Sequence, residues 1–342
     1  MIWVKIGVEN KSKDIEIIFK ILGKNIGEEV RLEKILEEML DRNVSSSDVL
    51  FLLLQKLKRD GYLEGRKGVI KVVKPIEKEE RVKIKKEIER RINRIKKLFV
   101  TPLEVAKFYQ CPRRFWLEKV VLSRQFKERR GKVWDGEVIH LAVKLFASQL
   151  GKKKIQECIE NAAEEALKKY EGKTELEKEK LVEFLKKFNE FLHEEKFVRV
   201  FPEKMIESFK IGLSGSPDLI GIKENGEIIA IDIKAGEMRR GIKKEHLLQN
   251  IGESILVENY FRKKVNECYL IYFGSDSLVK IKISRDMKDE FLKYKKLIGK
   301  FVASRRIPPK SRLPNYRKRV CQGCHVKPAC DNIEILRKFR KI

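Results

Sequence analysis

Residues 211–236 carry the sequence IGLSGSPDLIGIKENGEIIAIDIKAG, in which two apolar runs flank residues 223–226, KENG. Asn-Gly between apolar runs predicts a β-hairpin, because a tight turn needs positive φ and these two residues tolerate it. Side chains alternate across a strand, so Asp232 and Lys234 share one face and the neighbouring isoleucines share the other. A carboxylate and an ammonium on an apolar strand are costly to bury unless the protein uses them.

A third polar position in this stretch is Asp218, which follows a proline in the first apolar run. Three such groups beside one hairpin indicate a functional site, although the residues alone leave open a simple salt bridge between Asp232 and Lys234. The spacing of Asp218 and Asp232-Ile233-Lys234 resembles the PD-(D/E)XK nuclease superfamily. In that superfamily the two acids bind a divalent metal and the lysine serves the attacking water.

The chain as a whole is strongly basic. Its 342 residues include 78 Lys and Arg against 51 Asp and Glu, a formal net charge of +27. Nucleic acid is the partner that this charge favours, because lysine and arginine that bind phosphates release counterions, and this release favours binding. A third class, a scaffold that binds RNA or an anionic membrane, is supported by the net charge alone. A hyperthermophile surface explains part of the 38% charged content but would add both signs.

The first residues lack the pattern of a secretory signal peptide, and no apolar run reaches the roughly 18 to 20 residues that span a bilayer. We therefore expect a soluble cytoplasmic protein that has no membrane partner. In that compartment the six cysteines are expected to be ligands or core residues rather than disulfides.

Residues 1–75 predict a small α+β domain. Apolar repeats predict three helices, the last over residues 48–57, followed by two short strands around a basic glycine turn. This order resembles a winged helix, with Arg66 and Lys67 at the wing tip, where they would contact a phosphate backbone. DNA binding and protein docking both stay open for this domain. Residues 76–100 predict a basic linker helix with a thin apolar stripe.

The second motif consists of four cysteines, Cys111, Cys321, Cys324 and Cys330. The last three form a C-x2-C-x5-C cluster, in which two cysteines bind one metal or cluster and the third adds a thiolate. The upstream Cys111, at the predicted end of a helix, supplies the missing fourth ligand. Tetrahedral zinc and an iron–sulfur cluster both satisfy this set. Cys158 and Cys268 lie in apolar patterns and are predicted to be core residues.

One cysteine upstream and three after the nuclease motif resemble the RecB-like exonucleases of CRISPR systems and the nuclease domain of AddB proteins. In those families the four cysteines hold a [4Fe–4S] cluster that ties the C-terminal segment to the helix before the core. The resemblance covers roughly residues 101–332 and extends to Gln249, which matches the glutamine of the RecB-family motif. That motif commonly has tyrosine four residues later, where this chain has Glu253.

The resemblance also implies a metal centre. His140 matches a metal-binding histidine of these nucleases, and with Asp218, Asp232 and the Ile233 carbonyl it would hold Mn²⁺ or Mg²⁺. Carboxylate and carbonyl oxygens suit both ions, and the imidazole shifts the preference toward Mn²⁺. Lys234, together with the two acids and the RecB-type glutamine, would form the catalytic set.

The expected fold is α/β, with a PD-(D/E)XK (restriction-endonuclease-like) core over residues 101–342. We expect a helical insertion at about residues 151–200, a C-terminal segment bound through the Fe–S cluster, and the α+β winged-helix-like domain in front. The expected function is a metal-dependent DNA exonuclease acting on single-stranded ends. Its setting would be CRISPR adaptation, where it processes spacer precursors with integrase proteins, or related DNA processing.

A different class of protein stays open at this point. In this alternative the chain is a winged-helix DNA-binding regulator whose cysteines hold zinc or sense redox state and whose nuclease fold is inert. The presence of Asp218, Asp232 and Lys234 together argues against it. Cleavage of DNA with added Mn²⁺ separates the two classes.

Overall fold

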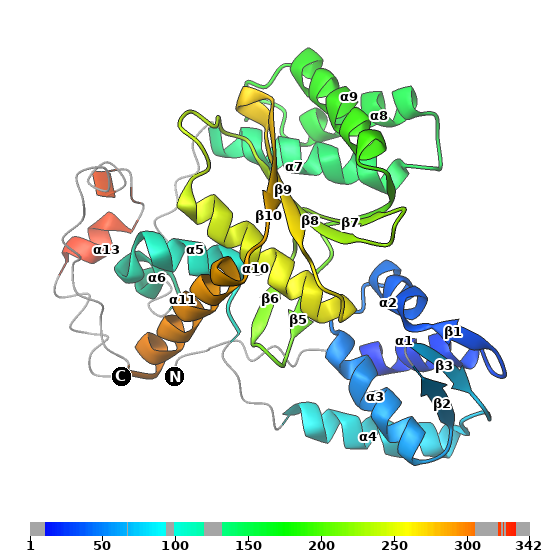
Figure 1. The fold of residues 1–342 in the computed structure, drawn as a ribbon. Coiled ribbons are helices and arrows are strands. Elements are labelled where there is room, and N and C mark those ends of the chain that lie inside the picture. Colours follow the sequence, from blue (N-terminus) through cyan, green and yellow to red (C-terminus); the bar gives the residue numbers. More distant parts are fainter. Residues whose placement is uncertain are drawn as a thin grey trace.

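The computed structural model describes residues 11–66, 68–93, 99–119, 132–304, 321–322, 324 and 326–332. Lys67, the second residue of the predicted wing tip, lies outside these ranges. The described chain contains a small N-terminal region and a larger region built on a mixed sheet, with helix α13 next to α6 on the side of the larger region away from the N-terminal region (Figure 1).

The N-terminal region combines helices with a small sheet. Its elements are α1 (Lys11–Gly23), β1 (Glu29–Arg31), α2 (Leu32–Asp41), α3 (Ser47–Arg59), β2 (Leu63–Arg66), β3 (Val69–Val72) and α4 (Lys78–Asn93). The strands form an antiparallel sheet in the order β1-β3-β2. The predicted helices and the two strands around the glycine turn are therefore present. Strand β1 was not predicted, because three residues are too few to show a period.

Helix α4 is not an isolated connecting helix, because its apolar stripe is buried against other helices. Ile84, Ile88 and Ile92 are at most 1% exposed and belong to the same core as α1 and α3, against which α4 packs. The predicted charged helix with its thin stripe is thus correct in pattern. Its stripe completes the N-terminal core, since an amphipathic helix buries its apolar face where a partner is available.

The larger region is built on a five-stranded sheet. Its elements are α5 (Pro102–Gln110), α6 (Pro112–Lys119), α7 (Lys132–Gln149), α8 (Ile155–Lys169), α9 (Lys178–Glu194), β4 (Phe197–Pro202), β5 (Ile206–Ser208), β6 (Leu213–Gly215), β7 (Leu219–Lys223), β8 (Ile228–Lys234), α10 (Lys244–Phe261), β9 (Glu267–Tyr272), η2 (Phe273–Ser275), β10 (Ser277–Lys282), α11 (Arg285–Ser304) and α13 (Lys327–Asp331). The strand order is β10-β9-β8-β7-β4. Strands β8 and β9 are parallel and joined through α10, whereas the other neighbours are antiparallel.

The predicted hairpin is confirmed as strands β7 and β8. At its turn Gly226 has φ of +77°, and the Glu227 amide donates to the side-chain oxygen of Asn225 at 2.9 Å. The first apolar run differs from the expectation, because it divides into two strands. Strand β6 pairs with β5 in a separate two-stranded sheet, and Pro217, which has no N–H to donate, lies between β6 and β7.

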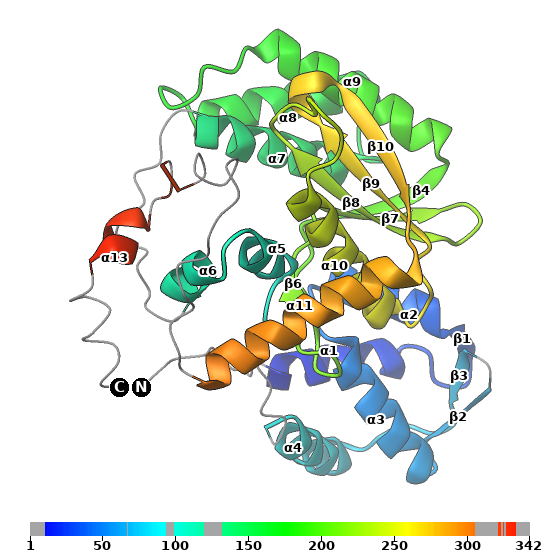
Figure 2. The same ribbon diagram turned by 60° about the vertical axis from the view of Figure 1, so that its left-hand side comes forward.

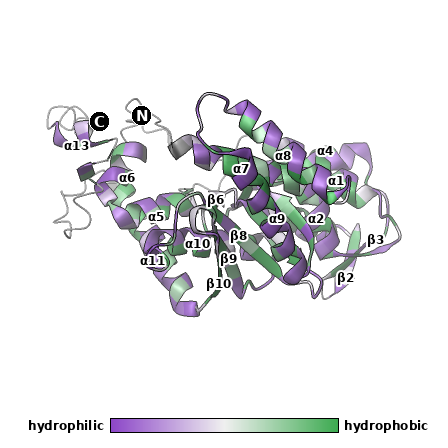
Figure 3. Cartoon of the chain, turned by 90° about the horizontal axis from the view of Figure 1, so that it is seen from above, coloured by the Kyte–Doolittle hydropathy of each residue, from purple (hydrophilic) through white to green (hydrophobic). Residues whose placement is uncertain are grey.

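Two layers of helices enclose the main sheet (Figures 1 and 2). Helices α7, α8 and α9 share a core with Ile231 and Ile233 of β8, and α10 covers the opposite face, with α5 and α11 packed on it. Figure 3 shows the hydrophobic colour along the strands and hydrophilic colour over much of the surrounding helices. None of the helices in the described chain is both long enough and apolar enough to cross a membrane.

The predicted helical insertion is shorter than expected. Helices α8 and α9 fill it, but Lys196 adopts a left-handed backbone with φ of 55°, and the chain then forms β4. Residues 197–200, expected to be helical, therefore begin the edge strand of the sheet. The sequence FVRVFP is rich in the β-branched and aromatic residues typical of a strand, a signal that the charged helical pattern before it obscured.

The N-terminal region docks on α10 and on the small β5–β6 sheet through polar contacts. The Tyr260 hydroxyl donates to the Val44 carbonyl at 2.8 Å, and Lys11 pairs with Glu207 at 2.6 Å. Asp48 at the start of α3 accepts from the Phe209 amide at 2.6 Å and also pairs with a basic side chain at the end of α10. These contacts fix one end of α10 to the N-terminal region.

Helix α10 packs so closely against α5 and α11 that one of its positions requires glycine. A Cβ added at Gly252 would lie 2.9 Å from Pro102 and closer still to the Phe291 ring.

We expect Gly252→Ala to lower the free energy of unfolding by about 1–3 kcal/mol through overpacking. Gly299→Ala in α11 meets nothing within 4 Å and should raise it by about 0.5–1 kcal/mol. Urea denaturation measures both, and equal shifts would contradict this packing.

Candidate active site

Asp218 is held in place immediately before β7. One of its carboxylate oxygens lies 3.1 Å from Nδ1 of His140 on α7, and the other accepts a hydrogen bond from the Ile233 amide at 2.7 Å. Ile233 was predicted to contribute its carbonyl to a metal. In the structure it is the amide of this residue that orients the Asp218 carboxylate across the two strands.

Asp232 and Lys234 lie at the end of β8 and form an ion pair of 2.7 Å. The salt bridge that the sequence left open is therefore present, but it is one part of a larger network. The Lys234 ammonium also donates to the side-chain oxygen of Gln249 at 3.0 Å. The Gln249 amide nitrogen donates to Asp232 at 3.1 Å and to Glu253 at 3.0 Å.

The geometry of α10 explains why this network forms. Residues four apart on a helix lie on one face, so Gln249 and Glu253 both turn toward the end of β8. His140 reaches the same place from α7, in the middle of that helix rather than at its start. The structure thus brings together His140, Asp218, Asp232, Lys234 and Gln249, the side chains that the sequence predicted as one site.

Burial and charge set the protonation of these groups. Burial raises the pKa of Asp232 to about 6, although Lys234 acts against this. Burial also opposes ionisation of Asp218, but His140, Lys234 and the Ile233 amide together lower the pKa of that carboxyl. In return Asp218 raises the pKa of His140 against the effect of burial. The site therefore holds one readily ionised acid beside one whose charge needs a nearby cation.

Glu253 occupies the position where the RecB-family motif commonly has tyrosine. Its side chain is 5% exposed, and burial followed by the charges of Asp232 and Asp218 raises its pKa. One oxygen accepts from Gln249, and the other has no hydrogen-bond partner within the described part of the chain. Glu253 is therefore a third acid directed at the site, which the sequence left as an open question.

His246 and Tyr272 were not predicted as part of this region. The His246 ring and the Tyr272 hydroxyl are hydrogen-bonded at 3.0 Å, and Tyr272 is the β9 partner of Lys234. Burial, followed by the charge of Lys234, lowers the pKa of His246 to about 4. The sequence signal was a histidine that follows a basic segment, in the first turn of α10, and the strand register supplies the rest.

The donor atoms at this site match a hard divalent cation. Two carboxylates and an imidazole suit Mg²⁺ or Mn²⁺. Within the described ranges no group of three or more His, Cys, Asp or Glu side chains has the arrangement of a metal centre. Instead, Lys234 and His140 contact the carboxylates, as the distances above show. The fit to a metal therefore rests on the chemistry of the donors.

The four predicted cysteine ligands come from both ends of the larger region. Cys111 caps α5 and accepts from the Arg114 amide at 3.4 Å, and Cys330 on α13 accepts from the Arg113 side chain at 3.2 Å. Burial, followed by Cys111 and Cys330, raises the pKa of Cys321. Helix α13 packs against α6, as Figure 2 shows. The fold thus brings thiols from distant segments within electrostatic reach of one another.

The remaining cysteines behave as predicted. Cys158 and Cys268 are fully buried in the two cores of the larger region, which confirms that they are core residues. Cys324 and Cys330 pack against a small separate core that contains Trp116 and Leu117. Donor type fits either zinc or an iron–sulfur cluster at the four-cysteine site.

A mixed sheet that gathers two acids, a lysine and a histidine at the ends of a hairpin is suited to metal-assisted hydrolysis. Residues 100–331 match the PD-(D/E)XK nuclease superfamily, whose members are typically metal-dependent nucleases. The chain belongs to this superfamily, and the predicted resemblance is confirmed at that level.

The comparison with solved structures adds little to this assignment. The structure titled "Crystal structure of SSO0001" is 14% identical, with a TM-score of 0.35, and the match covers 72% of this chain and 93% of that one. A likeness of this size supports no statement about function. No curated protein matches the chain significantly.

Gln249 links three charged groups, and its loss should destabilise the fold. We expect Gln249→Leu to lower the free energy of unfolding by about 1–3 kcal/mol, because buried polar atoms lose their hydrogen bonds. Urea denaturation in EDTA measures this. Gln156→Leu is the matched control, since Gln156 is an exposed helix residue that bonds only Glu160 in the described chain, and a change within about 0.5 kcal/mol is expected. Equal losses would show that the network contributes no stability.

Proposed function

We propose that the protein is a metal-dependent DNA exonuclease that hydrolyses phosphodiester bonds at single-stranded ends. Membership of the PD-(D/E)XK superfamily supports nuclease activity, and the exonuclease assignment is our inference from the resemblance to RecB-like enzymes. The observation that carries the proposal is the convergence of Asp218, Asp232 and Lys234 at the end of the hairpin.

The chain's own residues have separable roles in this proposal. His140, Asp218, Asp232 and the Ile233 carbonyl would hold Mg²⁺ or Mn²⁺. When bound, the ion supplies a water of lowered pKa and polarises the phosphate. The Lys234 ammonium orients the nucleophile and offsets the negative charge that develops on the phosphoryl oxygens.

Gln249 would act as a positioning residue. Its hydrogen bonds to Lys234 and Asp232 restrict the rotamers of both side chains. Such restriction aids catalysis, because a reacting group that is already oriented loses less entropy in the transition state. Glu253 in turn anchors the Gln249 amide from one helical turn away.

DNA as the substrate is supported by the net charge of +27 and by the phosphodiester chemistry of the superfamily. The resemblance to CRISPR-associated RecB-like enzymes supports a role in processing spacer precursors with integrase proteins, or in related DNA processing. Digestion of end-labelled DNA tests the proposed substrate, and binding to integrase proteins tests the proposed setting.

For the four-cysteine site we propose a [4Fe–4S] cluster bound by Cys111, Cys321, Cys324 and Cys330. Its support is the donor set of four thiols and the N–H···S hydrogen bonds from Arg113 and Arg114, which stabilise thiolate sulfur. The cluster would fasten α13 to the α5–α6 corner. Metal binding of this kind adds directly to folding free energy.

The predicted winged-helix-like domain at residues 1–75 would serve mainly for docking. Helix α3 is the element that a winged helix would use to read DNA, yet Phe51 on α3 packs under the Arg262 guanidinium at 4.6 Å. Asp48 at its N-terminus is engaged with the larger region. Arg66, at the end of β2, lies clear of that interface and would remain available to phosphate.

The active-site assignment predicts a selective loss of cleavage. We expect Asp232→Asn and Lys234→Ala each to reduce Mn²⁺-dependent digestion of end-labelled single-stranded DNA by about 10²–10³-fold or more, while DNA binding stays near wild type. Lys282→Ala, on the far edge strand β10, is the control and should digest normally. Normal cleavage by either site variant would overturn the assignment.

The cluster assignment predicts bound iron and sulfide. After anaerobic purification we expect the wild-type chain to contain both, with the visible absorbance of a [4Fe–4S] cluster, and Cys324→Ala to lose them. Cys158→Ala removes a buried core thiol and should keep the cluster. Zinc in place of iron, combined with absence of cleavage, would instead favour the DNA-binding regulator.

A further inference from the structure

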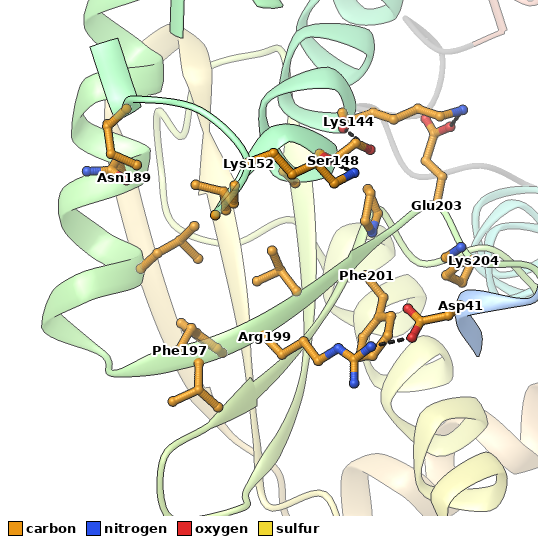
Figure 4. A pocket seen from close by; sticks show the side chains of 18 of the residues that line it. Asp41, Lys144, Ser148, Lys152, Asn189, Phe197, Arg199, Phe201, Glu203 and Lys204 are labelled. Carbon is orange, nitrogen blue, oxygen red and sulfur yellow. Dashed lines mark hydrogen bonds and ion pairs between the residues drawn. The ribbon is translucent and has the colours of Figure 1, made fainter. Parts of the chain in front are cut away.

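A cleft of about 760 Å³ lies along the edge strand β4 (Figure 4). Helix α7 contributes Lys144 and Ser148 to its wall, and β4 and the residues after it contribute Arg199 and Lys204. The N-terminal region adds Asp41 from the end of α2. We call this hollow the β4 cleft, and none of the predicted site residues lines it.

The β4 cleft opens beside the candidate active site. The amide of Glu203, at its mouth, donates to the Asp218 carbonyl at 2.9 Å. Lys144 lies one helical turn after His140 on α7 and pairs with Glu203 at 2.6 Å, as the dashed line in Figure 4 marks. Two residues that line the cleft, Lys144 and Glu203, are therefore neighbours of the His140–Asp218 pair, so one end of the cleft is adjacent to the candidate active site.

The cations of the cleft divide into two kinds. Lys144 and Arg199 each have carboxylate partners, Glu203 for the first and residues of α2 for the second. Lys152 and Lys204 have none within 4.0 Å among the described residues. Lys152 donates to a backbone carbonyl at 2.8 Å, and Lys204 donates to a side-chain amide oxygen at 2.9 Å.

The environment of Lys204 indicates that it needs an anion. Burial lowers its pKa, and Lys144 adds to this, while Asp41 acts in the opposite direction. A partly buried ammonium whose hydrogen-bond partner is neutral is stabilised when an anionic oxygen comes near. The cleft thus offers two sites for negative charge, Lys152 after α7 and Lys204 after β4.

The length of the cleft suits a short piece of single strand. From His140 to Gln149 helix α7 rises about 14 Å, which is enough for a few nucleotides along its side. Phe197 of β4 is a half-buried aromatic residue of the lining, and the buried Phe201 ring lies 4.8 Å from the Arg199 guanidinium. Cationic grooves with aromatic neighbours are the usual means by which proteins bind single strands without reading sequence.

We propose that the β4 cleft binds the sugar-phosphate backbone of single-stranded DNA next to the scissile phosphate, with Lys152 and Lys204 as the phosphate contacts. This inference rests on the proposed nuclease function, because continuity with the phosphodiester site is what favours DNA over an acidic protein segment. The contacts are to the backbone, so binding is independent of base sequence.

The test measures binding in EDTA, where no cleavage occurs, by fluorescence anisotropy of an end-labelled oligonucleotide of about 12 nucleotides, a length within known single-strand site sizes. The full-length Lys152→Ala/Lys204→Ala variant should bind about 10-fold more weakly than wild type. Its plot of log K against log salt should lose about 1.4 in slope, since each phosphate contact contributes about 0.7. Lys282→Ala, an exposed lysine on β10, should match wild type in both.

Thermal denaturation tests whether the double variant is folded. The variant Lys152→Arg/Lys204→Arg should retain the wild-type salt slope because it keeps both charges. The inference is overturned if the double variant binds with the affinity and slope of Lys282→Ala. It is also overturned if only binding of a polyglutamate peptide is lost, since the cleft would then accept an acidic protein. Failure of the proposed function appears separately, as wild-type protein that binds DNA but does not cleave it with Mn²⁺.

Discussion

The complete burial of the Asp232 carboxylate is the constraint on which the site depends. An ionised acid inside a protein is stable only when cations and hydrogen-bond donors replace its water. Lys234 supplies the charge and Gln249 supplies the donor, and each of these in turn contacts further polar groups. The apolar face of α10 packs in the core against the sheet, and this packing presents Gln249 to the strand end.

Helix α10 connects this charged network to the rest of the molecule. Its middle carries Gln249 and Glu253, and its last turn fixes the N-terminal region through Tyr260. Gly252 on the intervening surface lets α5 and α11 approach closely. A displacement of the N-terminal region would therefore shift α10 and with it Gln249, which orients Lys234. Helix α7, in the other helical layer, carries His140 independently.

Local pattern explains why much of this site was predictable. The alternation of β8 and the Asn-Gly turn are encoded within a few residues, so the shared face of Asp232 and Lys234 followed directly. The features that were missed depend on distant partners. The strand signal of β4 was obscured by the charged helical pattern before it, and its pairing with β7 defines it. The His246–Tyr272 contact needs the parallel register of β9, and the burial of Glu253 depends on packing by other helices. Sequence proximity carries no signal for such contacts.

The exposed edge of β4 also has a consequence for how the protein avoids self-association. An unpaired edge strand is a template to which a second chain can add by hydrogen bonding. Here the strand has an irregular register near Phe197, a charged Arg199 in its middle and Pro202 at its end. Each of these features disfavours regular strand addition. The strand can therefore keep its edge exposed to solvent without acting as a template for aggregation.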